Sequence, residues 1–403
     1  MPDIKKLREL QSLPLELKVE ITKQRIMEWV EYYGESNVYI SFSGGKDSTV
    51  LLNIVRDIFP SIPGVFFDTG LEYPEIRSFV SCFENIEWMK PDMNFKDIII
   101  KYGFPLISKE VSNTISGARK YFEYIIENDK NLKSLGSIQQ ILESDYLKKV
   151  IEKRANEPGA RYLAYTLDMM QKDGSVKYNS DISSASYYNI GKYKFLLYSP
   201  FEVTSQCCDI MKKKLSHKYI SKTKRVPMTG QMAYESELRK QQWVINGCNG
   251  FDMSNPRSNP MAFWLEQDVL QYIYNNNIPI SSVYGDIIST KNDKTGSTIL
   301  STTACSRTGC IFCGFGLHHD KYPNRFELID IVSNSKLREY VMRGGKFCDD
   351  GLWRPSDDGL GYWFVIQYLN IHGKFSIHIP EYEKYEALYG NEQTYQYLYG
   401  HLL

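Results

Sequence analysis

The stretch that decides the fold is VYISFSGGKDSTVLLNIV at residues 38–55, followed by GVFF at residues 64–67. The run VYISF is β-branched and aromatic, which is typical of a buried strand. A polar loop, SGGKDS, comes next, and the apolar pattern of TVLLNIV indicates a helix. GVFF then completes a strand–helix–strand unit, and such units build parallel sheets. We therefore predict an α/β protein with a parallel twisted sheet and flanking helices.

The loop Ser43–Ser48 has the composition of a phosphate-binding turn. Gly44 and Gly45 let the backbone turn tightly, so that its N–H groups can face an anion at the positive end of the following helix. Lys46 adds a positive charge beside Asp47. The Walker A spacing is absent, and the form SGGKDS matches the PP-loop of ATP pyrophosphatases. We predict that the whole loop binds nucleotide and that Lys46 and Asp47 are catalytic.

Two further polar segments follow predicted strands. Asp68 and Thr69 come directly after the second strand, at the edge where open α/β sheets bind ligands, and Asp68 is a candidate Mg²⁺ ligand. A third strand, predicted at Arg225–Thr229, leads into the other segment. Its candidate nucleotide-binding residues are Gly230, Gln231, Glu235, Ser236 and Arg239.

Five of the eight cysteines are clustered. Cys305, Cys310 and Cys313 lie within nine residues, among glycines that allow a loop to wrap around a metal centre. A fourth ligand must come from elsewhere, and the pair Cys207–Cys208 is the candidate source. Thiolate-only ligand sets suit either a [4Fe–4S] cluster or structural zinc. The cysteines therefore predict a metal centre.

These motifs together resemble the phosphoadenosine-phosphosulfate reductase-like branch of the PP-loop superfamily. The resemblance covers about residues 38–315, and the matching segments occur in the family's order. They are SGGKDS with DTGLEYPE, then Cys207-Cys-Asp-Ile-Met-Lys212, then TGQMAYES with Arg239, and finally Asn259-Pro-Met-Ala-Phe-Trp264 with Asp268-Val269 and Ile278-Pro279. The resemblance implies an adenine nucleotide alpha hydrolase-like fold. It also implies a nucleotide site built from the loop, Asp68 and residues 230–239, with Lys212 at the position of a functional basic residue.

The resemblance also bears on the metal. Adenylylsulfate reductases use a Cys-Cys pair with a C-x-x-C, as in Cys207–Cys208 and Cys310 with Cys313. DNA phosphorothioation sulfurtransferases have a single cysteine at the position of Cys208 and a cysteine-rich loop resembling residues 305–313. We favour a [4Fe–4S] cluster, with zinc as the alternative. The favoured ligands are Cys208, Cys305, Cys310 and Cys313, with Cys207 as an alternative ligand or a catalytic thiol.

The leading functional hypothesis is a sulfur-metabolism enzyme that uses ATP with Mg²⁺. It adenylates an acceptor with release of pyrophosphate, and a sulfur donor then displaces AMP. The acceptor is left open between a nucleic acid and a small molecule. For nucleic acid, a basic run between Asp209 and Arg225 offers a backbone-binding surface, although a solvated helix face explains it equally well.

Two alternatives stay open. The first is a reductase of adenylylsulfate or of phosphoadenosine phosphosulfate, which needs a thiol reductant. Reductases of this family attack with a cysteine in a C-terminal ECGIH-like motif, whereas the last cysteine here is Cys348, which counts against this alternative. The second is a non-catalytic nucleotide-binding subunit of a nucleic-acid modification or defence complex.

Composition sets the remaining expectations. The 403 residues are 42% hydrophobic and 24% charged, as in ordinary globular proteins, and Lys plus Arg balance Asp plus Glu at 48 each. The first residues lack a signal-peptide core and no run of about 18 apolar residues occurs, so we expect a cytoplasmic protein without a membrane span. The predicted divisions are a helical segment at 1–36, an α/β domain at 37–300 with a helical insertion at about 112–190, and a cysteine loop with a helix-rich region at 301–403. The oligomeric state is not predicted.

Overall fold

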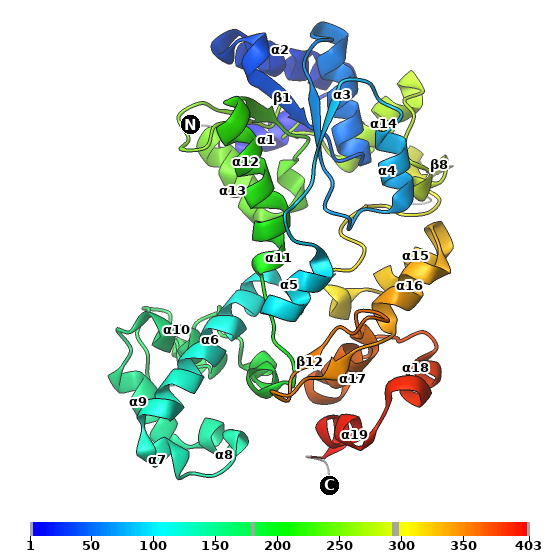
Figure 1. Ribbon diagram of the computed structural model, residues 1–403. Helices are drawn as coiled ribbons and strands as arrows, with labels where there is room; N and C mark the ends of the chain where they lie inside the picture. Colours follow the sequence, from blue (N-terminus) through cyan, green and yellow to red (C-terminus); the bar gives the residue numbers. More distant parts are fainter. Residues whose placement is uncertain (1–2, 179–181, 292–297, 401–403) are drawn as a thin grey trace. The chain divides into compact units, whose positions relative to one another are not determined.

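The computed structural model describes residues 3–178, 182–291 and 298–400 (Figure 1). The chain divides into two compact units. Unit 1 consists of residues 1–94, 210–311 and 331–333, and unit 2 consists of residues 95–209, 312–330 and 334–403. Within the described ranges, no helix combines the length and the apolar character needed to cross a bilayer.

Unit 1 is built on a six-stranded sheet in the order β3-β2-β1-β5-β7-β6, in which only β6 runs antiparallel to its neighbour. The strands are β1 (Val38–Ser41), β2 (Gly64–Phe67), β3 (Ile86–Met89), β5 (Val226–Met228), β6 (Asn249–Gly250) and β7 (Arg257–Ser258). A separate hairpin pairs β8 (Ile287–Lys291) with β9 (Thr298–Thr302). The predicted parallel sheet is confirmed, with β2 at its predicted bounds.

Helices flank this sheet, and Figure 1 shows α3 and α12 on opposite sides of β1. The helices of unit 1 are α1 (Ile4–Gln11), α2 (Leu15–Tyr33), α3 (Lys46–Ile58), α4 (Pro74–Val80), α12 (Lys214–Thr223), α13 (Glu237–Asn246) and α14 (Glu266–Asn276). β1 carries the hydrophobic core, because Val38, Tyr39 and Ile40 are all completely buried. Tyr39 packs edge-on against Tyr219 of α12 at a centroid distance of 4.8 Å.

A buried polar contact attaches α2 to α14. The Lys18 ammonium lies 2.6 Å from the Asp268 carboxylate, and the indole N–H of Trp264 donates to the Thr22 hydroxyl at 2.9 Å. Trp264 and Thr22 are both fully buried. The segment Asn259–Asp268, one of the four that carry the resemblance, therefore has a structural role in this packing.

Unit 2 is mostly helical. Its helices are α5 (Phe95–Tyr102), α6 (Lys109–Asn128), α7 (Lys130–Lys133), α8 (Ile138–Glu143), α9 (Asp145–Lys153), α10 (Pro158–Thr166), α11 (Gln206–Cys208), α15 (Arg325–Val332, whose last two residues fall in unit 1), α16 (Ser335–Met342), α17 (Tyr362–Gly373), α18 (Tyr382–Tyr389) and α19 (Glu392–Tyr399). Its strand pairs are β4 (Leu106–Ile107) with β10 (Gly314–Phe315), parallel, and β11 (Lys346–Phe347) with β12 (Trp353–Arg354), antiparallel.

The boundaries of the two units differ from the predicted divisions. We predicted the region 301–403 as a separate C-terminal part, whereas most of it shares a unit with residues 95–209. The reason is an aromatic core: Phe201 packs edge-on against Phe364 and Tyr368 of α17, at 6.5 and 5.2 Å. The helices predicted for the insertion at about 112–190 are present, and residues 179–181 of this insertion lie outside the described residues.

Candidate functional site

A cavity of about 530 Å³ opens in unit 1 where β1 and β5 end. The order of strands along the sheet reverses between these two, since β2 and β3 lie on one side of β1 and β5 lies on the other. Ligands of open α/β sheets bind at such a switch point, outside the carboxyl ends of the strands. Ser43, which follows β1, and Thr229, which follows β5, both line the cavity. Two of the predicted segments therefore meet at one cavity.

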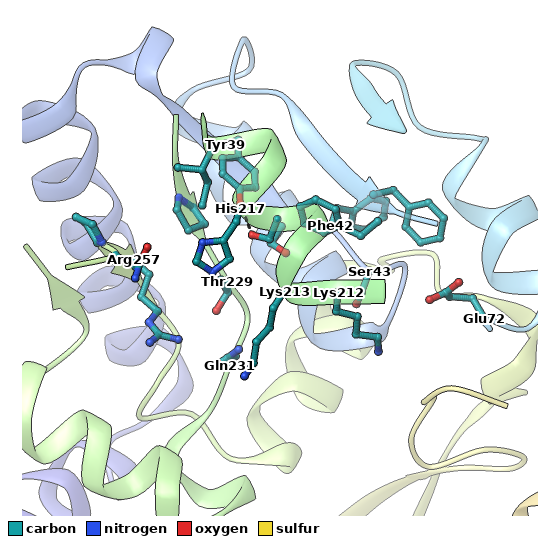
Figure 2. A pocket seen from close by; sticks show the side chains of 18 residues that line it. Tyr39, Phe42, Ser43, Glu72, Lys212, Lys213, His217, Thr229, Gln231 and Arg257 are labelled. Carbon is teal, nitrogen blue, oxygen red and sulfur yellow. Dashed lines mark hydrogen bonds between the residues drawn. The ribbon is translucent and has the colours of Figure 1, made fainter. Parts of the chain in front are cut away.

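The cavity has an apolar wall and a cationic rim. The wall is formed by Tyr39, Phe42, Phe66, Phe67, Ile220 and Pro227. Figure 2 shows Arg257 and Glu72 on opposite sides of the cavity, with Lys212, Lys213 and His217 between them. Glu72 is the one carboxylate in the described lining, and it accepts hydrogen bonds from the backbone N–H and the hydroxyl of Thr69, at 3.1 and 2.7 Å. An apolar pocket with convergent cations suits an aromatic base that carries an anionic group.

Lys212 and Lys213 reach this rim from an unusual turn. The chain forms the short helix α11 at Cys207 and Cys208, then a π-helical turn at Asp209–Lys213, and then continues as α12. π-Helical turns inside helices are frequent at functional sites. Lys212, which the resemblance puts at the position of a functional basic residue, lines the cavity, and its functional role stays a prediction.

The glycine loop adopts a tight turn before α3. Gly44 has φ +71°, and a Cβ at this position would approach Val80 Cγ2 to 2.7 Å, so a larger residue is excluded. The loop is closed by the backbone N–H of Ser43, which donates to the Ser48 hydroxyl at 3.1 Å. Gly45 is the N-cap of α3 and has no side chain to cap it, whereas the N–H of Lys46 donates to the Tyr284 hydroxyl at 3.1 Å. Uncapped N–H groups at a helix start provide a local site for an anion.

Lys46 and Asp47 point into a polar network. Lys46 is 2% exposed, and its Nζ lies 2.8 Å from the Ser306 carbonyl oxygen and 3.1 Å from the Glu266 carboxylate. Burial raises the pKa of Asp47, against the opposing charges of Lys46 and Arg307. In this conformation, the charge of Lys46 is therefore directed at the segment Cys305–Thr308.

The Gly230–Arg239 segment reaches the same network. A Cβ at Gly230 would lie only 3.0 Å from the Asp47 carbonyl oxygen, so the two segments are in close contact. Gln231 lines the cavity, and the Glu235 carboxylate pairs with the Arg239 guanidinium. Ser236 caps α13, since its hydroxyl accepts from the Arg239 N–H at 3.3 Å. The predicted loop and this segment are therefore brought together.

The Asp68 carboxylate, our candidate Mg²⁺ ligand, is paired with cationic side chains. Its carboxylate is buried and lies 2.8 Å from the Arg77 guanidinium and 3.9 Å from the Lys90 ammonium. It also accepts from the Gly70 N–H at 3.3 Å. Its negative charge is therefore neutralised by side chains in this conformation.

The candidate metal ligands are divided between the units. Cys305 and Cys310 belong to unit 1, whereas Cys207, Cys208 and Cys313 belong to unit 2. Within either unit, the described residues bring no three of His, Cys, Asp or Glu close enough together to hold a metal ion. In unit 2 the pKa of the buried Tyr362 is raised well above its usual value by burial and then by the charges of Cys313 and Cys207. Both thiols therefore lie close enough to the Tyr362 hydroxyl to act on its pKa.

Arg325 supports the end of the cysteine loop in unit 2. Its guanidinium donates to the carbonyl oxygens of Cys313 and Phe315, at 3.2 and 2.6 Å, and forms a two-pronged ion pair with Asp320. The Tyr362 hydroxyl donates to the Phe312 carbonyl oxygen at 3.0 Å. The turn that presents Cys313 is thereby fixed from two sides.

Sequence reasoning missed several residues of the site. Arg257 on the cavity rim, Tyr284 and Glu266 beside Lys46, and Arg307 near Asp47 were not predicted. No local pattern marks them, because they join the site through contacts between distant parts of the chain. Arg307, which lies between Cys305 and Cys310, was within reach of prediction as the basic residue of the cysteine loop.

A model of the phosphoadenosine phosphosulfate reductase domain family matches residues 37–107 and 164–314, more than half of the chain. The chain belongs to this family. The phosphoadenosine phosphosulfate reductase family model thus covers the glycine loop, the Cys207–Cys208 pair and Cys305–Cys313, and it omits most of the helical insertion.

Two individual proteins resemble this family member. The adenosine 5′-phosphosulfate reductase of Staphylococcus haemolyticus is 33% identical over 102 residues, which are 24% of this chain and 41% of that protein. The chain thus spans less than half the length of this curated relative. A crystal structure of phosphoadenylyl-sulfate reductase from Candida auris, in a phosphate complex, is similar with a TM-score of 0.32 and 12% identity, over 70% of this chain and 91% of that chain.

Proposed function

We propose that the chain is a sulfonucleotide reductase that binds adenylylsulfate, or its 3′-phosphate, in the unit 1 cavity and releases sulfite. The observation that carries this proposal is the lining of the cavity, in which Lys212, Lys213 and Arg257 accompany an apolar wall and a single described carboxylate. Such a lining suits an adenine base with an anionic tail. Membership of the family and the similarity to an adenosine 5′-phosphosulfate reductase support the same substrate class.

The state of Asp68 favours this proposal over the ATP-dependent one. Adenylation with ATP needs Mg²⁺, which prefers carboxylate oxygens and bound waters. The Asp68 carboxylate, our candidate for that ion, is paired with Arg77 at 2.8 Å. A sulfonucleotide needs no metal ion for binding, because cationic side chains can neutralise its charge.

In the proposed reaction, sulfur is reduced by two electrons. Two thiols are oxidised to one disulfide, the sulfur–oxygen bond to the nucleotide breaks, and sulfite leaves with release of two protons. The nucleotide product is AMP from adenylylsulfate and adenosine 3′,5′-bisphosphate from its 3′-phosphate. The cationic rim holds the phosphosulfate and offsets the charge that builds up on the departing nucleotide. Cys207 is our candidate for the attacking thiol, and the second thiol comes from an external dithiol. Full sulfite release by a Cys207→Ser variant would remove Cys207 from this role.

We also propose that Cys208, Cys305, Cys310 and Cys313 hold a [4Fe–4S] cluster, with Cys207 as an alternative ligand. Four thiolates are the donor set that such clusters take, and zinc is the alternative metal. When bound, the cluster would hold an electron or sulfur. Protein purified without oxygen should contain about four iron and four sulfide per chain. Stoichiometric zinc without sulfide would favour the alternative.

The test of the main proposal is sulfite release. Purified protein is incubated with adenylylsulfate or its 3′-phosphate and dithiothreitol, in the presence of a metal chelator that does not strip iron–sulfur clusters. We expect sulfite in an amount equal to that of the nucleotide product, without a need for Mg²⁺. That product is AMP from adenylylsulfate and adenosine 3′,5′-bisphosphate from its 3′-phosphate. Binding of ATP alone, with no binding of either sulfonucleotide, would overturn the proposal.

ATP-dependent adenylation remains a second candidate because of the glycine loop. SGGKDS has the form of an ATP pyrophosphatase loop, and it leads into a helix whose N-cap residue, Gly45, makes no side-chain capping hydrogen bond. Labelled ATP with Mg²⁺ and a panel of small-molecule and nucleic-acid acceptors would then yield AMP and pyrophosphate. Release of ADP and phosphate would exclude this candidate.

A further inference from the structure

A single buried hydroxyl joins the glycine loop to the cysteine segment Cys305–Thr308. Tyr284 is 1% exposed, and its hydroxyl accepts the backbone N–H of Lys46 at 3.1 Å. The same hydroxyl lies 3.0 Å from the Thr308 hydroxyl. The N–H of Lys46 belongs to the first turn of α3, where a bound anion would be received. The Tyr284 hydroxyl thus accepts the hydrogen bond that the Lys46 N–H would otherwise donate to an anionic ligand.

Lys46 forms the second connection. Its Nζ donates to the Ser306 carbonyl oxygen at 2.8 Å, and the residue is 2% exposed. The ammonium group is the strongest cation that the loop can offer to an anion. An anion at the loop therefore competes with the Ser306 carbonyl for Nζ and with the Tyr284 hydroxyl for the backbone N–H.

The segment itself is attached on its other side by backbone hydrogen bonds. The N–H groups of Ala304 and Cys305 donate to the carbonyl oxygens of Tyr284 and Val283, at 3.1 and 3.0 Å. The Thr302 hydroxyl donates to the Cys305 carbonyl oxygen at 2.9 Å. Tyr284 is therefore bonded to the segment through its backbone and to the loop through its side chain.

We propose that these contacts form a releasable tether: an anionic nucleotide that binds the glycine loop takes over the Lys46 donors and frees the segment Cys305–Thr308. Tyr284 is a positioning residue in this arrangement. A buried carbonyl that loses its donor is unfavourable until it reaches water or a new partner, so the segment must shift once Lys46 turns away. The proposal deepens the proposed function, because it rests on nucleotide binding at this loop.

Reciprocity gives the tether a distinctive signature. If nucleotide binding loosens the segment by a given factor, then loosening the segment must tighten nucleotide binding by the same factor. A residue that merely stabilises the fold has the opposite effect, since its loss weakens binding. Removing the Tyr284 hydroxyl therefore distinguishes the two roles.

Hydrogen–deuterium exchange of the amides of Thr303, Ala304 and Cys305 measures the tether. In the unmodified protein, saturating adenylylsulfate should speed their exchange by about fivefold or more, the usual lower range of coupling between sites. Adenosine, which can fill the cavity without an anion, should leave the exchange unchanged. Faster exchange with adenosine, or no change with bound adenylylsulfate, would overturn the tether.

Tyr284→Phe is the decisive variant. Without ligand, its exchange at these amides should match that of the nucleotide-bound unmodified protein, and its Kd for adenylylsulfate should fall. Thr308→Val removes the hydroxyl contact with Tyr284. Its exchange rates and its Kd should therefore lie between those of the unmodified protein and those of Tyr284→Phe. Tyr272→Phe is the matched control, because its hydroxyl bonds to Asn53 in the body of α3 at 2.9 Å, away from the loop.

The outcomes separate this inference from the proposed function. If adenylylsulfate does not bind, the proposed function fails, and the ligand-free comparison of Tyr284→Phe with Tyr272→Phe still tests the tether. If adenylylsulfate binds, but Tyr284→Phe binds it more weakly and exchanges like the control, the tether is wrong and the proposed function stands.

Discussion

The imidazole of His318 is packed among other rings within unit 2. It lies against the rings of Tyr193 and Phe375, with centroid distances of 6.2 and 5.0 Å. Both ring nitrogens are buried, without a hydrogen-bond partner among the residues that the structure describes. Burial, and then the charges of His319 and Lys192, lower the pKa of His318 from 6.5 to about 4, whereas Asp320 opposes the shift.

This shift predicts an acid-sensitive contribution to stability. Between pH 6.5 and about 4 the unfolded chain binds a proton that the folded chain excludes at His318. The free energy of unfolding should therefore fall as the pH falls through this window. His318→Leu should flatten that dependence in urea unfolding curves recorded from pH 7 to 4. An unchanged pH slope in His318→Leu would contradict this assignment.

The cationic rim gives a second prediction for single side chains. A hydrogen bond to a charged group contributes about 1.5–3 kcal/mol, so Lys213→Ala or Arg257→Ala should raise the Kd for adenylylsulfate by about tenfold or more. Added salt should weaken binding less in these variants than in the unmodified protein. Isothermal titration calorimetry at two salt concentrations measures both effects. Lys222→Ala, exposed on α12 and absent from the cavity lining, is the control. An equal rise of the Kd in all three variants would mean that the overall positive charge of this region, and not the cavity rim, attracts the nucleotide.

Among the helices, α2 and α14 depend on the pair of Lys18 and Asp268. The Lys18 side chain is 2% exposed, and the two charged groups lie 2.6 Å apart. Removing one partner of a buried pair leaves the other charge uncompensated, so Lys18→Met should lower the free energy of unfolding by about 3–5 kcal/mol. The double variant Lys18→Met/Asp268→Leu should recover part of this loss.

An exposed pair within α1 provides the contrast. Lys6 and Glu9 lie 3.5 Å apart with more than half of each side chain exposed. Lys6→Met should change the free energy of unfolding by less than about 1 kcal/mol. Denaturant unfolding curves of all three variants measure these free energies. Equal losses of unfolding free energy in Lys18→Met and Lys6→Met would show that burial does not determine the contribution of the Lys18 pair.

For the chain as a whole, the division into two units predicts a local response to ligand. The cavity lies entirely within unit 1. Adenylylsulfate at 100 times its Kd should therefore stabilise unit 1 by about 2.7 kcal/mol. Hydrogen exchange of core amides in β1 and β2 should slow accordingly, whereas amides in the core of α17 should not change. Equal slowing in both units would mean that they unfold together.

The sequence by itself determined the strand, glycine loop and helix at the centre of unit 1. The strand β2, the loop Ser43–Ser48 and the helix α3 follow from neighbouring residues, because alternation of apolar runs, glycines and helix formers acts over a few positions. The meeting of the loop with residues 230–239 was implied by the family resemblance, and the structure brings the two segments into contact.

Only the tertiary structure decided what surrounds that loop. Lys46 meets Tyr284 across 238 residues and Ser306 across 260, and no local pattern encodes contacts of that separation. The same holds for Arg257 on the cavity rim and for the packing of Phe201 against α17, which sets the boundaries of unit 2. Side-chain direction at a site is set by the partners that burial brings within reach, and those partners come from distant parts of the chain.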